Sequence, residues 1–168
     1  IADDGFTISD SINTTVMGNE PEAMCKTTGL AIIQLSEVFR KMKPTAVLTI
    51  ADRFETMATA IAASYQNIPL IHLQGGEITG SIDEKVRHSI TKLADIHLVA
   101  NKHAKDRVIR MGENPKNVFD VGCPSIDLAK EILAMPTLDF DVVEKYGGTG
   151  ANINTKAGYY VVLQHPVT

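Results

Sequence analysis

The feature that most constrains the fold is a regular alternation of short, β-branched or apolar runs with segments of helical periodicity, from residue 22 to residue 133. The pattern predicts strands at 45–50, 69–74, 96–100 and 117–122. It predicts helices at 22–42, 55–66, 83–94, 102–112 and 125–133. Such alternation implies parallel βαβ crossovers and helices on both faces of the sheet. The sequence therefore predicts an α/β fold with a doubly wound, parallel, Rossmann-like sheet.

The alternation lapses after Pro136, and this change predicts the domain organisation. We interpret residues 1–136 as one Rossmann-like domain and the polar, glycine-rich stretch 137–158 as a linker. The apolar run that follows, within 159–168, is predicted to be the first strand of a second domain that the chain does not complete. The start, "IADDGF", lacks an initiator methionine and does not look like a secretory signal. We therefore expect the chain to begin inside a longer protein.

Composition excludes several classes of protein. The 168 residues carry a net charge of -4 without a lysine or arginine cluster, which argues against binding to nucleic acid. Apolar runs are too short to cross a bilayer, so no membrane association is expected. Cys25 and Cys123 lack metal-ligand spacing, which predicts neither zinc nor a disulfide and favours a reducing cytoplasm. Neither a G-x-G-x-x-G fingerprint nor a Walker loop is present, so we expect no dinucleotide, ATP or metal cofactor.

Polar groups follow three of the predicted strands, in "ADRFE", "QGGEITGSIDE" and "QHPVT". In open parallel sheets, ligands bind beyond the carboxyl ends of the strands. We therefore expect these three stretches to contribute to one site.

The first stretch has two interpretations. Asp52 and Glu55 have the three-residue spacing of a helix N-terminal capping arrangement. Alternatively, Asp52 is an acid/base group and Arg53 is a cation that faces a phosphate, for which its planar guanidinium is well suited.

In the second stretch, Gly75 and Gly76 permit a sharp turn and a close approach of the backbone to a ligand. Ser81 or Asp83 can cap the helix that follows, which would direct its first amides at an anion.

Charged side chains on that helix are spaced four residues apart: Asp83 with Arg87, and Glu84 with His88. This spacing places them together on one helix face, where they could line a crevice. The alternative is a solvated first turn with ordinary ion pairs.

Three histidines lie within predicted strands or directly after one. His165 follows an apolar run and directly precedes Pro166, at a predicted strand end. It is either a site residue or a hydrogen-bonded loop histidine. His72 and His97 lie within predicted strands, and we interpret both as core histidines.

Taken in order, "ADRFE", "IHLQGGEITGSIDEKVRHSITKLADIHLVAN", "VGCPSID" and "LQHPVT" resemble the hydrolysing UDP-N-acetylglucosamine 2-epimerases of sialic acid and related nonulosonic acid biosynthesis. The resemblance covers essentially the whole chain. It implies a two-domain, glycosyltransferase-B-like architecture with a site between the domains. By this resemblance the chain is most of the N-terminal domain, without its first strand and helix, plus the first strand of the C-terminal domain, and we expect a homo-oligomer.

The resemblance also implies a reaction. The UDP-sugar loses its C2 proton and UDP to give a 2-acetamidoglucal, and water then adds to release a manno-configured N-acetyl sugar. Asp52, Asp83 and His165 match the catalytic positions of the family. Arg53 would face the phosphates, and the sugar pocket would be lined by Glu84, Arg87 and His88.

The sequence departs from the family pattern at two positions. Ala51 stands where the family usually has glycine, and Gln74 replaces the catalytic glutamate of the sialic acid branch. Glutamine cannot exchange protons usefully but can hydrogen-bond an amide. Either Glu77 takes over part of that role, or the pocket serves another sugar. The glutamine form resembles the legionaminic acid branch, which uses UDP-N,N'-diacetylbacillosamine, and this sugar and UDP-N-acetylglucosamine remain alternatives.

Two other functions are compatible with the same residues. A glycosyltransferase would require an acceptor and would not exchange the C2 proton. A catalytically silent nucleotide-sugar-binding domain would bind the ligand without turnover.

Overall fold

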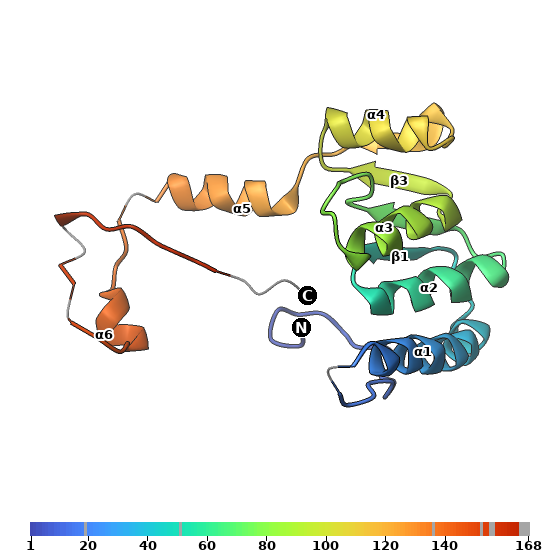
Figure 1. Ribbon diagram of the computed structural model, residues 1–168, viewed down its shortest axis with the longest axis horizontal. Coiled ribbons are helices and arrows are strands. Elements are labelled where there is room, and N and C mark those ends of the chain that lie inside the picture. The colour runs from blue at the N-terminus through green and yellow to red at the C-terminus, as the bar shows by residue number, and fades with distance from the viewer. Residues whose placement is uncertain (19, 51, 136, 152, 155–156, 165–168) are drawn as a thin grey trace. The chain divides into compact units, whose positions relative to one another are not determined.

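The computed structural model describes residues 1–18, 20–50, 52–135, 137–151, 153–154 and 157–164 (Figure 1). The chain divides into two compact units, Ile1–Cys123 and Pro124–Thr168. In the described residues, no helix is both long enough and apolar enough to span a bilayer.

The first unit contains a four-stranded parallel sheet in the order β1-β2-β3-β4. Its strands are β1 Val47–Ile50, β2 Leu70–Leu73, β3 Ile96–Val99 and β4 Val118–Asp120. Its helices are α1 Pro21–Met42, α2 Phe54–Tyr65, α3 Ile82–Leu93 and α4 Lys102–Arg110, with a single 3-10 turn at Pro115–Asn117. The predicted parallel α/β fold is confirmed, and every predicted strand and helix of this unit is present.

Local sequence explains where these helices start and stop. Proline at the first position of α1 suits a turn whose amides have no helical partner, and Arg40 and Lys41 complement the carbonyl end of the helix. Ser81 accepts a hydrogen bond from the Asp83 amide at the start of α3, and Asn101 accepts one from the Ala104 amide at the start of α4.

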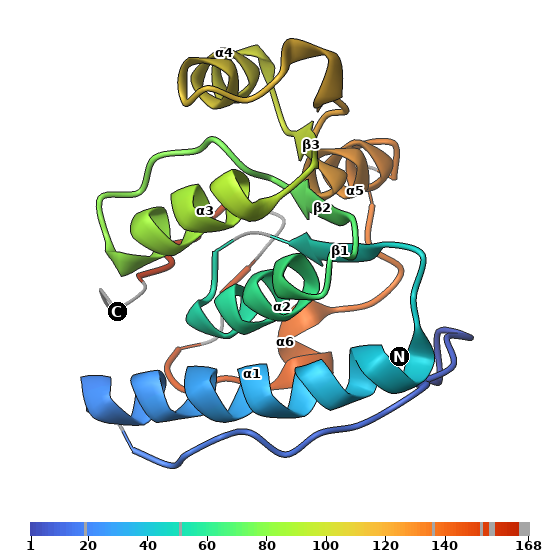
Figure 2. The ribbon, with the colours of Figure 1, turned by 90° about the vertical axis from the view of Figure 1, so that its right-hand side faces the viewer.

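The core lies on one face of the sheet (Figure 2). Side chains pointing to this face are fully or almost fully buried beneath α2, α3 and α4; they include Val47, Leu70, His72, His97, Val99 and Val118. Small alanines of α2 allow that helix to pack closely, while α1 packs outside α2 (Figure 2). The prediction that His72 and His97 are core histidines is confirmed, since both are fully buried.

Helices were expected on both faces of the sheet, but the opposite face is partly exposed. Leu48, Ile50 and Phe119 are 56%, 48% and 47% exposed. The three helices that follow β1, β2 and β3 all pack on the other face. Within the described part of residues 1–123, helices therefore cover one face only.

In its described residues, the second unit contains two helices, α5 Pro124–Leu133 and α6 Val142–Tyr146. Sequence reasoning missed α6, which lies inside the segment interpreted as a linker. Asp141 caps it by accepting hydrogen bonds from the amides of Val143 and Glu144, at 2.8 and 2.9 Å. Asp141 and Glu144 have capping-box spacing, so a signal was present.

Residues 159–164 form neither helix nor strand. A strand requires a neighbour to pair with, and the described residues supply none here. The proposed first strand of a second domain therefore stays a prediction, as do the linker at 137–158 and the domain boundary at 136.

Candidate active site

The site lies at the carboxyl ends of β1 and β2. Asp52 follows β1, and the turn 74–77 follows β2 and leads on to α3. Parallel neighbouring strands bring these ends to the same edge of the sheet. Two of the three predicted stretches therefore meet. In the third stretch, His165 and the three residues after it lie outside the described residues.

Arg87 of α3 links the two strand ends. Its Nη2 donates to Asp52 Oδ2, and its Nη1 donates to the Glu77 carbonyl oxygen at 2.8 Å. The Arg87 side chain is only 3% exposed, while that of Asp52 is 21% exposed. The ordinary pair with Asp83, which belonged to the alternative interpretation of this helix turn, is not seen in the described residues; Arg87 pairs instead with a residue that follows β1. Arg87 thus holds Asp52 and the β2 turn in fixed relation.

Arg53 remains on the surface, with 74% of its side chain exposed. Its Nε and Nη2 donate to the two carboxylate oxygens of Glu55 at 3.2 and 2.9 Å, and this hydrogen bonding raises the pKa of Arg53. Burial, the largest single influence, raises the pKa of Glu55, but the Arg53 hydrogen bond, a backbone hydrogen bond and the Arg53 charge together lower it. The capping interpretation of Asp52 is wrong, because Arg53 occupies the N-cap of α2 without a side-chain cap. Asp52 is left to pair with Arg87.

Gln74 adopts a left-handed backbone conformation, with φ of 62°. A non-glycine residue in this region costs about 1–3 kcal/mol and is held there by its surroundings, most often at functional sites. The backbone N–H of Gln74 donates to the Leu98 carbonyl oxygen at 2.8 Å, and the side-chain Nε2 of Gln74 lies 3.4 Å from the thiol sulfur of Cys123. The backbone and side chain of Gln74 are therefore both held, and no sequence signal revealed this.

The two glycines that follow are required by close packing. A Cβ at position 75 would lie 2.8 Å from His72 Nδ1 and 3.0 Å from Thr91 Oγ1. One at position 76 would lie 2.6 Å from the Ala104 carbonyl oxygen, and this glycine also has φ of +83°. The doublet therefore presses against β2, α3 and α4 at once, which explains why no larger side chain occurs there.

Glu84 secures the loop that leads into α3. Its Oε2 accepts hydrogen bonds from the amides of Gly80 and Thr79 at 2.8 and 2.9 Å. These bonds, that of Gly80 first, lower the pKa of Glu84. Ser81 caps the helix, so of the two predicted cap residues the structure selects this one and leaves the Asp83 carboxylate available.

His88 lies next along the same helix. Its Nδ1 is buried and has no hydrogen-bond partner among the described residues. The predicted Glu84–His88 pairing is thus electrostatic rather than a hydrogen bond.

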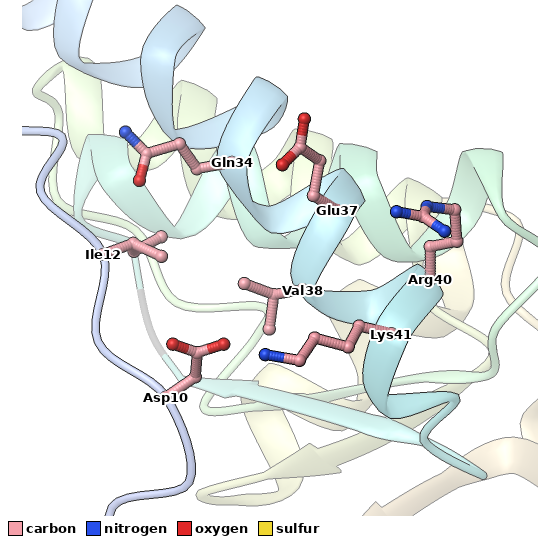
Figure 3. Close-up of a pocket in the computed structure, with 7 residues that line it drawn as sticks. All are labelled: Asp10, Ile12, Gln34, Glu37, Val38, Arg40 and Lys41. Carbon is pink, nitrogen blue, oxygen red and sulfur yellow. The ribbon is translucent and has the colours of Figure 1, made fainter.

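Two cavities border α1, and the Arg87–Asp52 pair lines neither of them. The one in Figure 3, of about 360 Å³, is formed by the N-terminal segment and the second half of α1; it is lined by Asp10, Ile12, Gln34, Glu37, Val38, Arg40 and Lys41. It contains none of the predicted site residues. A second, of about 290 Å³, includes Arg53 and Glu55 together with residues from the start of α1. We place the candidate site by its chemistry at the strand ends, not by these cavities.

The arrangement supplies carboxylates from Asp52 and Asp83, an accessible guanidinium from Arg53, and an amide from Gln74 that can orient a polar ligand. Carboxylates are among the side chains that can transfer protons, and an exposed arginine is suited to a phosphate group.

Comparison with known proteins identifies close similarities. The family model described as UDP-N-acetylglucosamine 2-epimerase matches residues 1–168. The chain is 41% identical over 145 residues to a UDP-N,N'-diacetylbacillosamine 2-epimerase (hydrolyzing) of Legionella pneumophila, covering 86% of this chain and 38% of the relative. It is 35% identical over 147 residues to a UDP-N-acetylglucosamine 2-epimerase of Neisseria meningitidis, covering 88% and 37%.

The fold is similar to solved structures as well. A UDP-N-acetylglucosamine 2-epimerase from Rickettsia bellii matches with a TM-score of 0.66 and 25% identity, over 80% of this chain and 36% of that one. The chain thus spans about two fifths of the length of the curated relatives it matches, such as 38% of the Legionella protein.

Proposed function

Because the chain belongs to the UDP-N-acetylglucosamine 2-epimerase family, we propose that the full-length protein is a hydrolysing 2-epimerase of a UDP-N-acetylated sugar. It removes UDP and adds water to give the free manno-configured sugar. The supporting observation is the cluster at the strand ends, in which buried Arg87 joins Asp52 to the turn that carries Gln74 and Glu77.

The proposed chemistry needs a group that removes the C2 proton, a group that returns one, and positive charge near the departing diphosphate. Asp52 and Asp83 are proposed as acid/base residues, with Glu77 assisting, and His165 is proposed to join them from the second domain. Arg53 is proposed to contact the phosphates. To do so it must exchange its surface pairing with Glu55 for the ligand, and a phosphate bearing more negative charge favours that exchange.

Arg87 and Glu84 are proposed to line the sugar pocket and to hold the loop after β2 in position. Both already make hydrogen bonds to backbone groups of the β2 loop. His88, four residues after Glu84 on the same helix face, is proposed to line the sugar pocket.

For the sugar, we propose UDP-N,N'-diacetylbacillosamine, with UDP-N-acetylglucosamine as the alternative. The 41% identity to the Legionella relative favours the first. Gln74 is consistent with it, since an amide in place of a carboxylate can hydrogen-bond an acetamido group without adding charge.

Single substitutions in the full-length protein test the assignment. Asp52→Asn, Asp83→Asn and His165→Ala should each reduce release of UDP by at least about a hundredfold, the scale of a lost acid/base group. Asp106→Asn removes a carboxylate from the exposed side of α4, where it pairs with Lys102, and serves as the matched control. Near wild-type rates in all three site variants would refute the assignment. Transfer to an acceptor without loss of the C2 proton would instead identify a glycosyltransferase.

A further inference from the structure

Two arginines from different helices hold consecutive carbonyl groups of the β2 turn. Arg107 of α4 donates from Nη1 to the Gly76 carbonyl oxygen, and Arg87 of α3 donates to that of Glu77. Hydrogen bonds from charged donors are about twice as strong as neutral ones. The turn is therefore fixed from two sides.

Packing around Gly76 makes the Arg107 contact specific. The turn lies directly on α4, because a Cβ at Gly76 would meet the Ala104 carbonyl oxygen at 2.6 Å and Val108 Cγ2 at 2.7 Å. Ala104 and Val108 are buried, while the side chain between them in the helix, that of Arg107, is only partly so. Arg107 thus reaches from the edge of this packed surface to the carbonyl.

We infer that Arg107 is a positioning residue for the reaction: it acts through the Gly76 carbonyl to hold Gln74 and Glu77 where they meet the sugar. The inference rests on the proposed function, which places those two side chains at the substrate. Gln74 already adopts a strained backbone conformation, with φ of 62°. Such a conformation persists only while its surroundings enforce it. Without Arg107, the turn can relax and move both side chains away from the productive geometry.

The chain offers a matched control on the same helix. Arg110 lies in the same last turn of α4 as Arg107, so replacing either removes one positive charge from the same helix end. Arg110 is exposed and, in the described residues, has no hydrogen bond to the β2 turn. Comparing Arg107→Met with Arg110→Met therefore separates the carbonyl contact from charge and helix-dipole effects.

The experiment uses the full-length protein and two readouts. Hydrogen exchange, read by mass spectrometry on peptides that cover residues 74–80, should become at least about tenfold faster in Arg107→Met and stay unchanged in Arg110→Met. With the preferred UDP-sugar, kcat should fall by about tenfold or more in Arg107→Met while KM changes less, because small misplacements act mainly on the chemical step. Arg107→Lys, which keeps the charge and one donor, should recover part of kcat.

Outcomes separate the two proposals. If exchange and kcat in Arg107→Met match those in Arg110→Met, the positioning role is overturned. Should Arg107→Met fail to fold, the same comparison is made between Arg107→Ala and Arg110→Ala, and equal exchange and kcat in those two variants overturn the role equally. Absence of turnover by the wild-type protein counts against the proposed function, whereas the exchange measurement still reports on the contact between Arg107 and the Gly76 carbonyl.

Discussion

Arg87 and Asp52, which are 35 positions apart in the chain, form a partly buried ion pair across the ends of two parallel strands. The same guanidinium also donates to the Glu77 carbonyl oxygen. One side chain of α3 thus sets the relative position of an acidic residue after β1 and of the turn after β2. This relationship, more than any single residue, defines the candidate site.

Replacing Arg87 should therefore affect both stability and turnover. Arg87→Met leaves Asp52 without its cation and should destabilise the protein by about 2–3 kcal/mol, below the value for a fully buried pair because Asp52 is 21% exposed. Thermal unfolding of the full-length protein should show a midpoint several degrees lower, and UDP release should fall sharply. Lys85→Met, which removes an exposed cation from the same helix, is the control. Equal midpoints in the two variants would contradict the structural role of the pair.

Two glycines of the β2 loop allow backbone strain to be separated from packing. Gly76 and Gly80 both have positive φ, but a Cβ at Gly80 would meet nothing within 4 Å. Gly80→Ala should cost about 1–2 kcal/mol, the penalty for an L-residue in the left-handed region. Gly76→Ala should cost about 1–3 kcal/mol more, from overpacking against α4. Denaturant unfolding measures both, and equal losses would show that Gly76 is not packed as described.

The order and type of the regular elements could be predicted from sequence, because each strand and helix carries its own periodicity. The predicted ends of helices and strands agree with the observed ends within a few residues. For example, the helix predicted at 83–94 is Ile82–Leu93. The short α6 was missed because one turn of helix has no measurable periodicity, although Asp141 and Glu144 marked its start.

The pairings within the site could not be predicted in the same way. Spacing favoured Arg87 with Asp83, since residues four apart are neighbours on a helix. The actual partner, Asp52, comes from another element, and only the fold brings it near. The contact of Arg107 with Gly76 and the left-handed conformation of Gln74 are hidden for the same reason: they depend on how α4 and β3 meet the turn.

Gln74 should influence which sugar is processed. Gln74→Glu supplies the carboxylate of the sialic acid branch at a position where the backbone is already held. We expect relative kcat/KM to shift toward UDP-N-acetylglucosamine and away from UDP-N,N'-diacetylbacillosamine, by about tenfold or more, since one polar contact made or lost is worth about 1–3 kcal/mol. Competition between the two sugars in one reaction measures this ratio directly. An unchanged ratio would remove Gln74 from the specificity determinants.

His97 should make stability depend on pH. Burial lowers its pKa from the ordinary value of 6.5, despite Glu113, whose Oε2 lies 3.4 Å from His97 Nε2, and Lys92 opposes protonation further. The unfolded chain therefore takes up a proton that the folded chain resists. The contribution of neutral His97 to the free energy of unfolding is complete above about pH 6.5. It is lost as the pH falls toward the lowered pKa of His97 in the folded chain.

Substitution tests this dependence. In His97→Gln, the unfolding free energy should change less between about pH 7 and about pH 5 than in wild type. His103→Gln, which replaces an exposed histidine at the start of α4, should keep the wild-type profile. The same slope in all three proteins would contradict the assignment to His97.

The central claim is that the full-length protein eliminates UDP and hydrates the resulting glycal. Incubation with each of the two UDP-sugars in D2O, followed by proton and phosphorus NMR, tests it most directly. The account predicts free UDP and a manno-configured sugar that carries deuterium at C2, with UDP-N,N'-diacetylbacillosamine consumed faster. Recovery of both sugars intact, or release of UDP with the C2 proton retained, would contradict it.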